Sequence, residues 1–384
     1  MPDVVAILEQ GRHPPPGRKG YLDWLRGAGV VVMIQGHVID AWTSAAGRER
    51  TAHQWITFVG GIGGAPIFLF LAGVSLALAA GARMRAGRTD AEAVALARRR
   101  GWQILGLALL FRMQAWLISG GGLQTILKVD ILNVIGVSMV AAAALWALAR
   151  QGRPRALLLA AAAAAAAMLT PVVRNAGLLA VLPDPLERYL RPAAGATTFT
   201  LFPWAGFVLA GCAVGLWLES ARTSGGERRA NAAIGAAGLV LAAGGYAASL
   251  LPPVYADTSF WTSSPTFFFI RLGIVMALVA AAYALNRGAG RSPLAEFGRS
   301  SLFVYWIHVE MAYGVVSAPL HRQLPLEQAY LGFVLLTMVL FGIVKLKNRM
   351  TSGRAKARPL RPIGSLIPHP DPEARTRRDT SSWR

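Results

Sequence analysis

Long apolar segments recur along the chain and restrict what it can fold into. Runs of about 20 residues match the length that a helix needs to cross a hydrocarbon core about 30 Å thick. We expect about ten such spans, near residues 21–43, 56–80, 100–119, 130–149, 156–173, 199–218, 231–251, 266–286, 300–318 and 327–346. Composition agrees, because 54% of the 384 residues are hydrophobic and only 15% are charged. The sequence predicts an all-α, polytopic membrane helix bundle.

The two ends of the chain differ from this apolar region. We expect a cytoplasmic tail over residues 1–20, an integral membrane domain over 21–350, and a disordered basic cytoplasmic tail over 351–384, where prolines stand among arginines. The first twenty residues lack the apolar core and cleavage site of a signal peptide, so the first span is expected to remain as an anchor.

Basic residues in the loops predict the orientation of the chain. Alternate loops carry clusters of arginine, whereas the loop over 251–266 has none. The positive-inside rule then places both termini in the cytoplasm. The net charge of +20 follows mostly from this bias and from the carboxyl tail. No nucleic-acid-binding motif accompanies the charge, so membrane lipids are the expected partners and nucleic acid is not.

The first apolar segment carries the candidate catalytic residues. Arg26 and His37 are eleven positions apart, which at about 100° per residue returns to the same helix face about 16 Å along the axis. Ionisable groups inside a span are costly and usually mark a functional site. Histidine titrates near working pH, so His37 is a candidate general base for a hydroxyl or amine. Asp40, one turn further, is a candidate to orient the imidazole.

The spacing of these residues suits a long thioester donor. About 16 Å is comparable to an extended pantetheine-like arm, so arginines at the inner end would hold the phosphates while the acyl group reaches His37. Arg26, Arg98 and Arg99 are the phosphate candidates. A run of arginines beside a span also fits a purely topological signal. No metal-ligand spacing stands out, and the single cysteine, Cys212, excludes an intramolecular disulfide.

Seven further polar residues lie toward the outer ends of the spans. They are Arg112, Lys128, Asp130, Asn133, Arg271, His308 and Glu310. Because exposing such groups to lipid costs free energy, we expect them to converge on a cavity that opens outward and binds the acceptor. Structural alternatives stay open for several of them. Lys128 and Arg271 can snorkel to the interface, Asp130 and Asn133 can cap a helix, and His308 can form an interhelical hydrogen bond.

Several motifs resemble a known superfamily. Arg26 and His37 match the basic residue, ten intervening residues and histidine of the transmembrane acyltransferase superfamily. The chain looks most like bacterial proteins with the heparan-alpha-glucosaminide N-acetyltransferase catalytic domain, through residues 22–27, 66–73, 129–136, 202–204 and 298–308. The resemblance implies transfer of an acyl group from cytoplasmic acyl-CoA, expected to be acetyl-CoA, to a hydroxyl or amine of an extracytoplasmic glycan or similar acceptor. It implies a bacterial cytoplasmic (inner) membrane protein and no permanently bound cofactor.

Two alternatives remain beside this interpretation. The lysosomal relative places its catalytic histidine in the loop before the second span, shortly before a tryptophan. His53 and Trp55 are similar, with a spacing one residue shorter, so His53 is a second candidate base. In function, a transporter or lipid carrier that uses the same polar residues as a substrate or proton path is the main alternative, and a scaffold without chemistry is the third.

Overall fold

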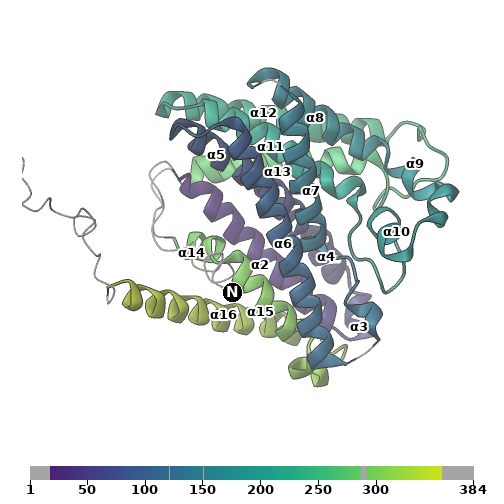
Figure 1. The fold of residues 1–384 in the computed structure, drawn as a ribbon. Helices are drawn as coiled ribbons and strands as arrows, with labels where there is room; N and C mark the ends of the chain where they lie inside the picture. The colour runs from purple at the N-terminus through teal and green to yellow at the C-terminus, as the bar shows by residue number, and fades with distance from the viewer. Residues whose placement is uncertain (1–17, 121, 150, 287–291, 357–384) are drawn as a thin grey trace, which may run out of the picture.

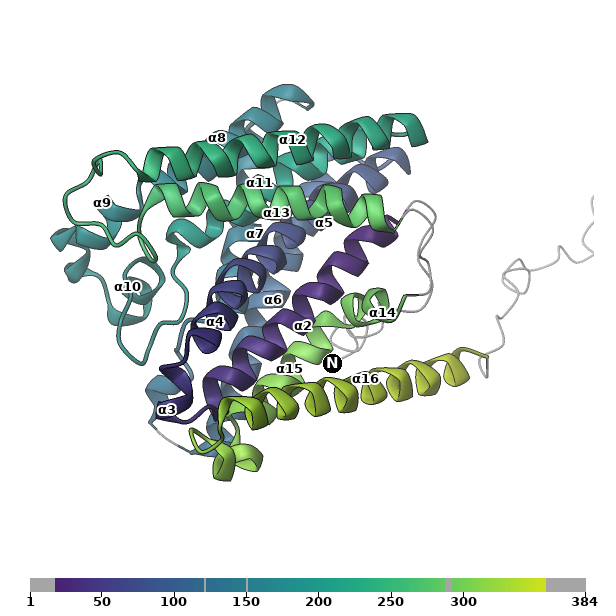
Figure 2. The ribbon, with the colours of Figure 1, turned by 180° about the vertical axis from the view of Figure 1, so that it is seen from behind.

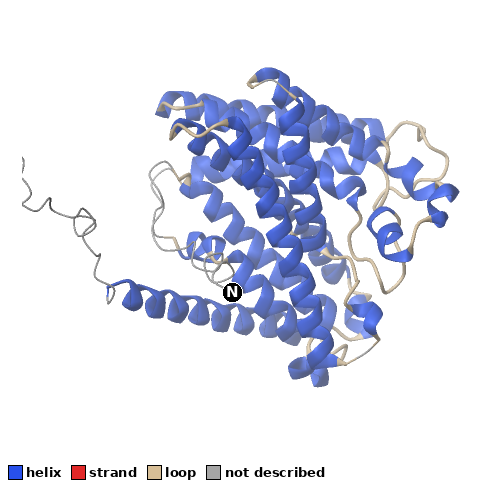
Figure 3. Ribbon diagram, viewed as in Figure 1, coloured by secondary structure: helices blue, strands red, loops and turns tan. Residues whose placement is uncertain are grey.

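The computed structural model describes residues 18–120, 122–149, 151–286 and 292–356 (Figure 1). Within these residues every extended regular element is helical, and two isolated β-bridges are the sole strand-like pairings (Figure 3). The predicted all-α bundle is therefore confirmed. The expected terminal tails fall mostly outside the described residues, although the last helix continues to Lys356, past the predicted boundary at 350.

Long helices form the body of the protein and short ones connect them. The long helices are α2 (Gly20–Trp42), α4 (Thr51–Gly63), α5 (Ala65–Arg85), α6 (Asp90–Ser119), α7 (Ile131–Leu148), α8 (Arg153–Met168), α11 (Leu201–Ser220), α12 (Ser224–Ser249), α13 (Pro265–Leu285), α15 (Ser301–Tyr313) and α16 (Leu326–Lys356). The short ones are α3 (Ala45–Arg48), α9 (Thr170–Asn175), α10 (Asp184–Leu190) and α14 (Pro293–Arg299), with 3-10 turns η1 (Leu123–Thr125), η2 (Gly177–Val181) and η3 (Val315–Leu320).

Seven segments of the described chain are long and apolar enough to cross a membrane. They cover residues 51–85, 90–118, 131–148, 201–220, 224–249, 265–285 and 326–351. The multi-pass membrane class is thus confirmed, whereas the count of about ten spans is not. Of the other three expected spans, α8 has 16 residues and α15 has 13. The third, α2, has 23 residues, but its polar side chains lower its hydropathy.

Helix α2 lies at the centre of the bundle. It contacts α4, α5 and α13 as well as α14, α15 and α16. Figure 2 shows it in purple between α13 and α16. Its apolar residues, such as Val30, Ile34 and Val38, are fully buried. Because neighbouring helices surround it, Asp23 and Arg26 of α2 face protein or a cavity within the protein, whereas Asp40 near its end is exposed.

Two glycines let α2 and α14 touch at the backbone. A Cβ atom on Gly27 would lie 1.7 Å from the Leu294 carbonyl oxygen, and one on Gly298 would lie 1.8 Å from the Asp23 carbonyl oxygen. No side chain larger than a hydrogen atom fits at either position without moving a backbone. This contact fixes α14, and with it Arg299, beside the first turns of α2.

Candidate active site

Two histidines from distant parts of the chain meet inside the bundle. His37 lies on α2 and His308 on α15, and the Nδ1 atom of His37 is 2.9 Å from the Nε2 atom of His308. The Nδ1 atom of His308 is 2.8 Å from the carbonyl oxygen of Val304, one turn earlier on the same helix. His308 is fully buried, whereas His37 is partly exposed. Within this pair, His37 is therefore the ring that a reactant can reach, whereas His308 is enclosed by protein.

The two rings lie nearly in one plane and meet edge to edge. Their planes differ by 8° and their centroids are 5.1 Å apart. A ring with bonds near 1.35 Å has a radius of about 1.1 Å. Two such radii added to the 2.9 Å between the nitrogens reproduce the centroid separation. The contact is therefore a straight, in-plane hydrogen bond between nitrogens and not a face-to-face stack.

Asp40 does not contact His37 in the way that the sequence suggests. Its Oδ2 atom accepts a hydrogen bond of 2.9 Å from the Tyr313 hydroxyl, and Arg48 lies 3.5 Å from its Oδ1 atom. The Asp40 side chain is 61% exposed. The Tyr313 ring centroid lies 5.5 Å from that of His37, so Tyr313 contacts both the carboxylate and the imidazole. Among the described residues, His308 and not Asp40 holds the His37 ring by a hydrogen bond.

His53 lies in the first turn of α4, near the same exposed group of charges. Its Nε2 atom is buried and has no hydrogen-bond partner among the described residues. The charges of Arg48 and Asp40 act on its imidazole. His53 is therefore near the Asp40 end of α2, but it is not part of the His37–His308 pair, and its role as a base stays a prediction.

A large basic cavity opens at the other end of α2. It has a volume of about 1240 Å³, above the range of about 300–1,000 Å³ usual for ligand pockets. Nine basic side chains line it, against the three acidic ones Asp23, Glu219 and Glu227. The basic residues are Arg18, Lys19, Arg26, Arg83, Arg85, Arg99, Arg100, Arg222 and Arg299. This excess of positive charge around a deep cavity suits a ligand that carries several phosphates.

The cavity follows the helix face that joins Arg26 to His37. Arg26 and Met33 both line it, and Met33 lies on the same face, seven residues after Arg26 and four before His37. Seven residues correspond to about 10 Å of helix, so the last turn before His37 leaves about 6 Å. Tyr305 also lines the cavity, and its ring centroid is 5.7 Å from that of His308. The cavity thus ends within one turn of both histidines.

The three predicted phosphate ligands differ in their positions. The Arg26 guanidinium donates to Ser75 Oγ at 2.7 Å and to Asp23 Oδ1 at 3.2 Å, which fixes it in the cavity wall. Arg99 lines the same cavity. Arg98 is exposed and is not part of the lining. The structure therefore brings Arg26 and Arg99 together at one cavity and leaves Arg98 outside it.

Five of the seven predicted acceptor ligands gather near α15. Arg112 and Asp130 form an ion pair of 2.8 Å, and both charges act on the Tyr305 ring beside His308. Asp130 also caps α7 together with Asn133, as the structural alternative proposed. Burial, more than the nearby Arg112, lowers the pKa of Lys128. The fifth, Glu310, lies within range of the Arg112 charge.

The remaining two predicted ligands have different surroundings. His308 pairs with His37, whereas Arg271 stacks on aromatic rings. Its guanidinium carbon lies 3.8 Å from the Phe267 ring centroid and 5.5 Å from that of Trp204. None of the seven lines the basic cavity. The structure therefore brings the other six together around α15 and leaves Arg271 apart, and the outward-opening cavity expected among them stays a prediction.

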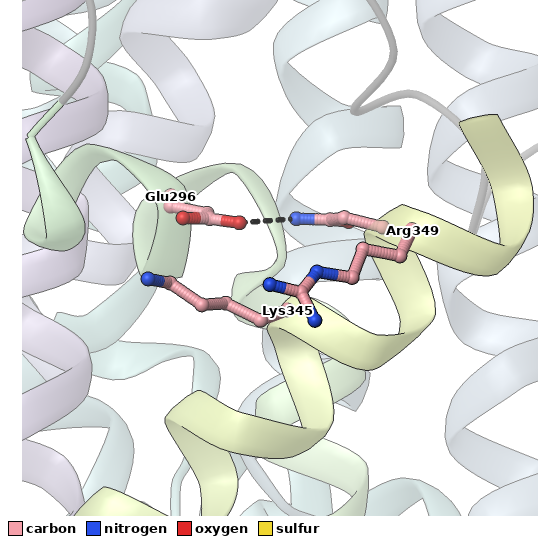
Figure 4. A pocket seen from close by; sticks show the side chains of 4 residues that line it. Glu296, Lys345 and Arg349 are labelled. Carbon is pink, nitrogen blue, oxygen red and sulfur yellow. Dashed lines mark hydrogen bonds between the residues drawn. The ribbon is translucent and has the colours of Figure 1, made fainter.

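A second, smaller hollow lies between α14 and α16 (Figure 4). It has a volume of about 440 Å³ and is lined by Glu296, Lys345, Asn348 and Arg349. The Asn348 amide donates a hydrogen bond of 2.7 Å to Glu296 Oε1, so the Glu296 carboxylate already has a partner. The hollow contains neither histidine nor any of the predicted site residues, and it plays no part in the candidate active site.

Sequence reasoning missed most of the basic residues of the cavity, and also Met33, Ser75, Tyr305 and Tyr313. Met33 carried a usable signal, because it lies on the face shared by Arg26 and His37. Tyr305 carried one too, because it lies one turn before His308, whereas Ser75 and Tyr313 carried none, since each reaches the site from a helix other than α2.

Comparison with known families agrees with this geometry. The family model described as heparan-alpha-glucosaminide N-acetyltransferase, catalytic, matches residues 18–245. The match covers more than half of the chain and includes Arg26 and His37, while His308 lies beyond it. A search of curated proteins finds no match to the chain. The chain therefore belongs to the heparan-alpha-glucosaminide N-acetyltransferase catalytic-domain family, as a multi-pass membrane protein of the acyltransferase type.

Proposed function

We propose that the protein transfers an acyl group, expected to be acetyl, from acyl-CoA to a hydroxyl or amine of a glycan or similar acceptor. The observation that carries this proposal is the path of the basic cavity. It begins among arginines and follows the Arg26 face of α2 to within one turn of His37. Acyl-CoA fits such a cavity, because its phosphates suit the basic end and its neutral arm and thioester suit the end near His37.

The charged end of the cavity supports the binding of the donor. Four of its basic residues lie against carboxylates: Arg18 and Arg26 on Asp23, Lys19 on Glu227, and Arg85 on Glu219. The basic residues still outnumber the acidic ones by six. Arginine forms paired hydrogen bonds with phosphate, so this excess favours the nucleotide and pyrophosphate groups of coenzyme A.

The other end supports the chemistry. His37 would take the proton from the acceptor hydroxyl or amine while the new C–O or C–N bond forms at the acyl carbonyl. The tetrahedral intermediate then breaks its C–S bond, and the proton passes from His37 to the leaving sulfur. General-base catalysis of this kind contributes about 10²–10⁴-fold to a rate.

The two reactants would approach from opposite sides. The arginine clusters of the loops favour a cytoplasmic position for the basic cavity, where acyl-CoA is made. The acceptor then reaches His37 from the side of Asp40 and Tyr313, which are exposed. We therefore place the protein in the bacterial inner membrane with both termini in the cytoplasm and the acceptor outside.

Acetyl transfer by the purified protein in liposomes tests the proposal. Acetyl-CoA labelled in the acetyl group is supplied with amino sugars and short glycans, and labelled products are counted. We expect His37→Ala to lower turnover at least about 100-fold. His321→Ala is the matched control, because His321 contacts Ser317 outside the site.

The outcomes separate the alternatives. Loss of turnover in His53→Ala but not in His37→Ala would move the base to His53. Accumulation of solute inside the liposomes without any labelled product would favour a carrier and contradict the proposed reaction.

A further inference from the structure

The hydrogen bonds of His308 determine where each ring carries its proton. A carbonyl oxygen only accepts, so the His308 Nδ1 atom, 2.8 Å from the Val304 oxygen, must be the donor. A neutral imidazole has one donor and one acceptor, which leaves the His308 Nε2 atom as an acceptor. The His37 Nδ1 atom, 2.9 Å away, must then donate to it. The proton of His37 therefore sits on Nδ1, and its Nε2 atom keeps a free lone pair.

The surroundings of His308 support its neutral form. The ring is fully buried, and the groups that the structure places against it are His37, Tyr305 and the Val304 carbonyl. No carboxylate is among them in the described part of the chain. A buried cation without a counter-charge is costly, so a positively charged His308 is disfavoured here.

We propose that His308 is the positioning residue that fixes the tautomer of His37. This inference rests on the proposed function, because it assigns how the general base is prepared. A proton on the His37 Nε2 atom would block that atom as a base. The bond from Nδ1 to His308 holds the proton on the other nitrogen and aims the ring, the task that a carboxylate performs in many catalytic triads.

His308 neither gains nor loses a proton during the reaction. The His37 Nε2 atom receives the acceptor proton as the new C–O or C–N bond forms, and it returns that proton to the sulfur as the C–S bond breaks. Throughout, the His37 Nδ1–H group continues to donate to the His308 Nε2 atom. The acceptor replaces coenzyme A on the acyl carbon, so atoms and charge balance without a further reactant.

Two amide substitutions distinguish positioning from packing. In His308→Gln the side-chain amide reaches the place of the Nε2 atom and offers an oxygen to the His37 Nδ1–H group. In His308→Asn the amide reaches only the place of the Nδ1 atom. We expect His308→Asn to lower kcat at least about 100-fold with the KM for acetyl-CoA changed less than about 2-fold, and His308→Gln to recover most of that loss. His321→Asn and His321→Gln are the matched controls.

Nitrogen NMR of the full-length protein, labelled with ¹⁵N-histidine, tests the tautomer directly. Signals missing in His37→Gln identify His37. We expect a protonated Nδ1 and a bare Nε2 in the wild type at neutral pH, and a shift of the proton toward Nε2 in His308→Asn. A His37 proton on Nε2 in the wild type, or wild-type kcat in His308→Asn, overturns the inference. Absence of acetyl transfer by the wild type contradicts the proposed function instead, and the NMR result still decides the tautomer.

Discussion

The glycine contact between α2 and α14 gives a prediction with a magnitude set by the structure. In Gly27→Ala the new Cβ atom would lie 1.7 Å from the Leu294 carbonyl oxygen, whereas ordinary contact begins near 3.4 Å. The two backbones must separate by about half of that contact distance. No flexible side chain is there to absorb the shift, so the cost should reach the upper end of the 1–3 kcal/mol or so usual for overpacking.

Thermal unfolding of the purified protein in detergent measures this effect. Gly36→Ala, on the same helix, is the matched control, because a Cβ atom at position 36 would meet nothing within 4 Å. We expect Gly27→Ala to lower the melting temperature by about 5 °C or more. Gly36→Ala should leave it unchanged or raise it slightly, because alanine favours helix. Equal melting temperatures for the two variants would refute the proposed backbone contact.

Three further predictions concern the cavity and the cluster near α15. Arg26→Gln should raise the KM for acetyl-CoA about 10-fold, because a charged hydrogen bond to phosphate is worth roughly 1.5–3 kcal/mol; initial-rate kinetics measure it. Met33→Trp should fill the end of the cavity and abolish acetyl transfer while acetyl-CoA still binds, as calorimetry would show. Asp130→Leu should destabilise the protein by about 1 kcal/mol more than Asp130→Asn, because asparagine keeps the cap of α7; equal melting temperatures would contradict this.

The sequence alone predicts the helical bundle and the position of Arg26 and His37 on one face. Both follow from local periodicity, and α2 indeed runs unbroken from Gly20 to Trp42. Local capping also explains Asp130 and Asn133 at the start of α7. The number of spans is harder to predict. Helices α15, with 13 residues, and α8, with 16, are too short to cross a hydrocarbon core about 30 Å thick, although both pack into the bundle.

The partner of His37 cannot be read from local spacing. Asp40 is one turn away in sequence, but its carboxylate contacts Tyr313, which is 273 positions distant. His308 is 271 positions distant and forms the hydrogen bond instead. The way helices cross decides such contacts, and periodicity within one helix does not. The sequence therefore predicts His37, Asp40 and His308 as site residues but not which of them form a hydrogen bond. The basic cavity is of the same kind, because its wall combines residues of nine helices, from α2 to α15.

Disulfide trapping tests the central claim, that coenzyme A lies along α2 with its thiol end near His37. Cys212 is fully buried and is the one cysteine of the chain, so Met33→Cys in a Cys212→Ser background presents a single reactive thiol at the end of the cavity. Oxidised coenzyme A would exchange with that thiol and release reduced coenzyme A. Mass spectrometry should show a coenzyme A adduct at position 33 that acetyl-CoA prevents, and none in a Met338→Cys control on the exposed face of α16. An unmodified Cys at position 33, or equal labelling of both positions regardless of acetyl-CoA, would contradict the account.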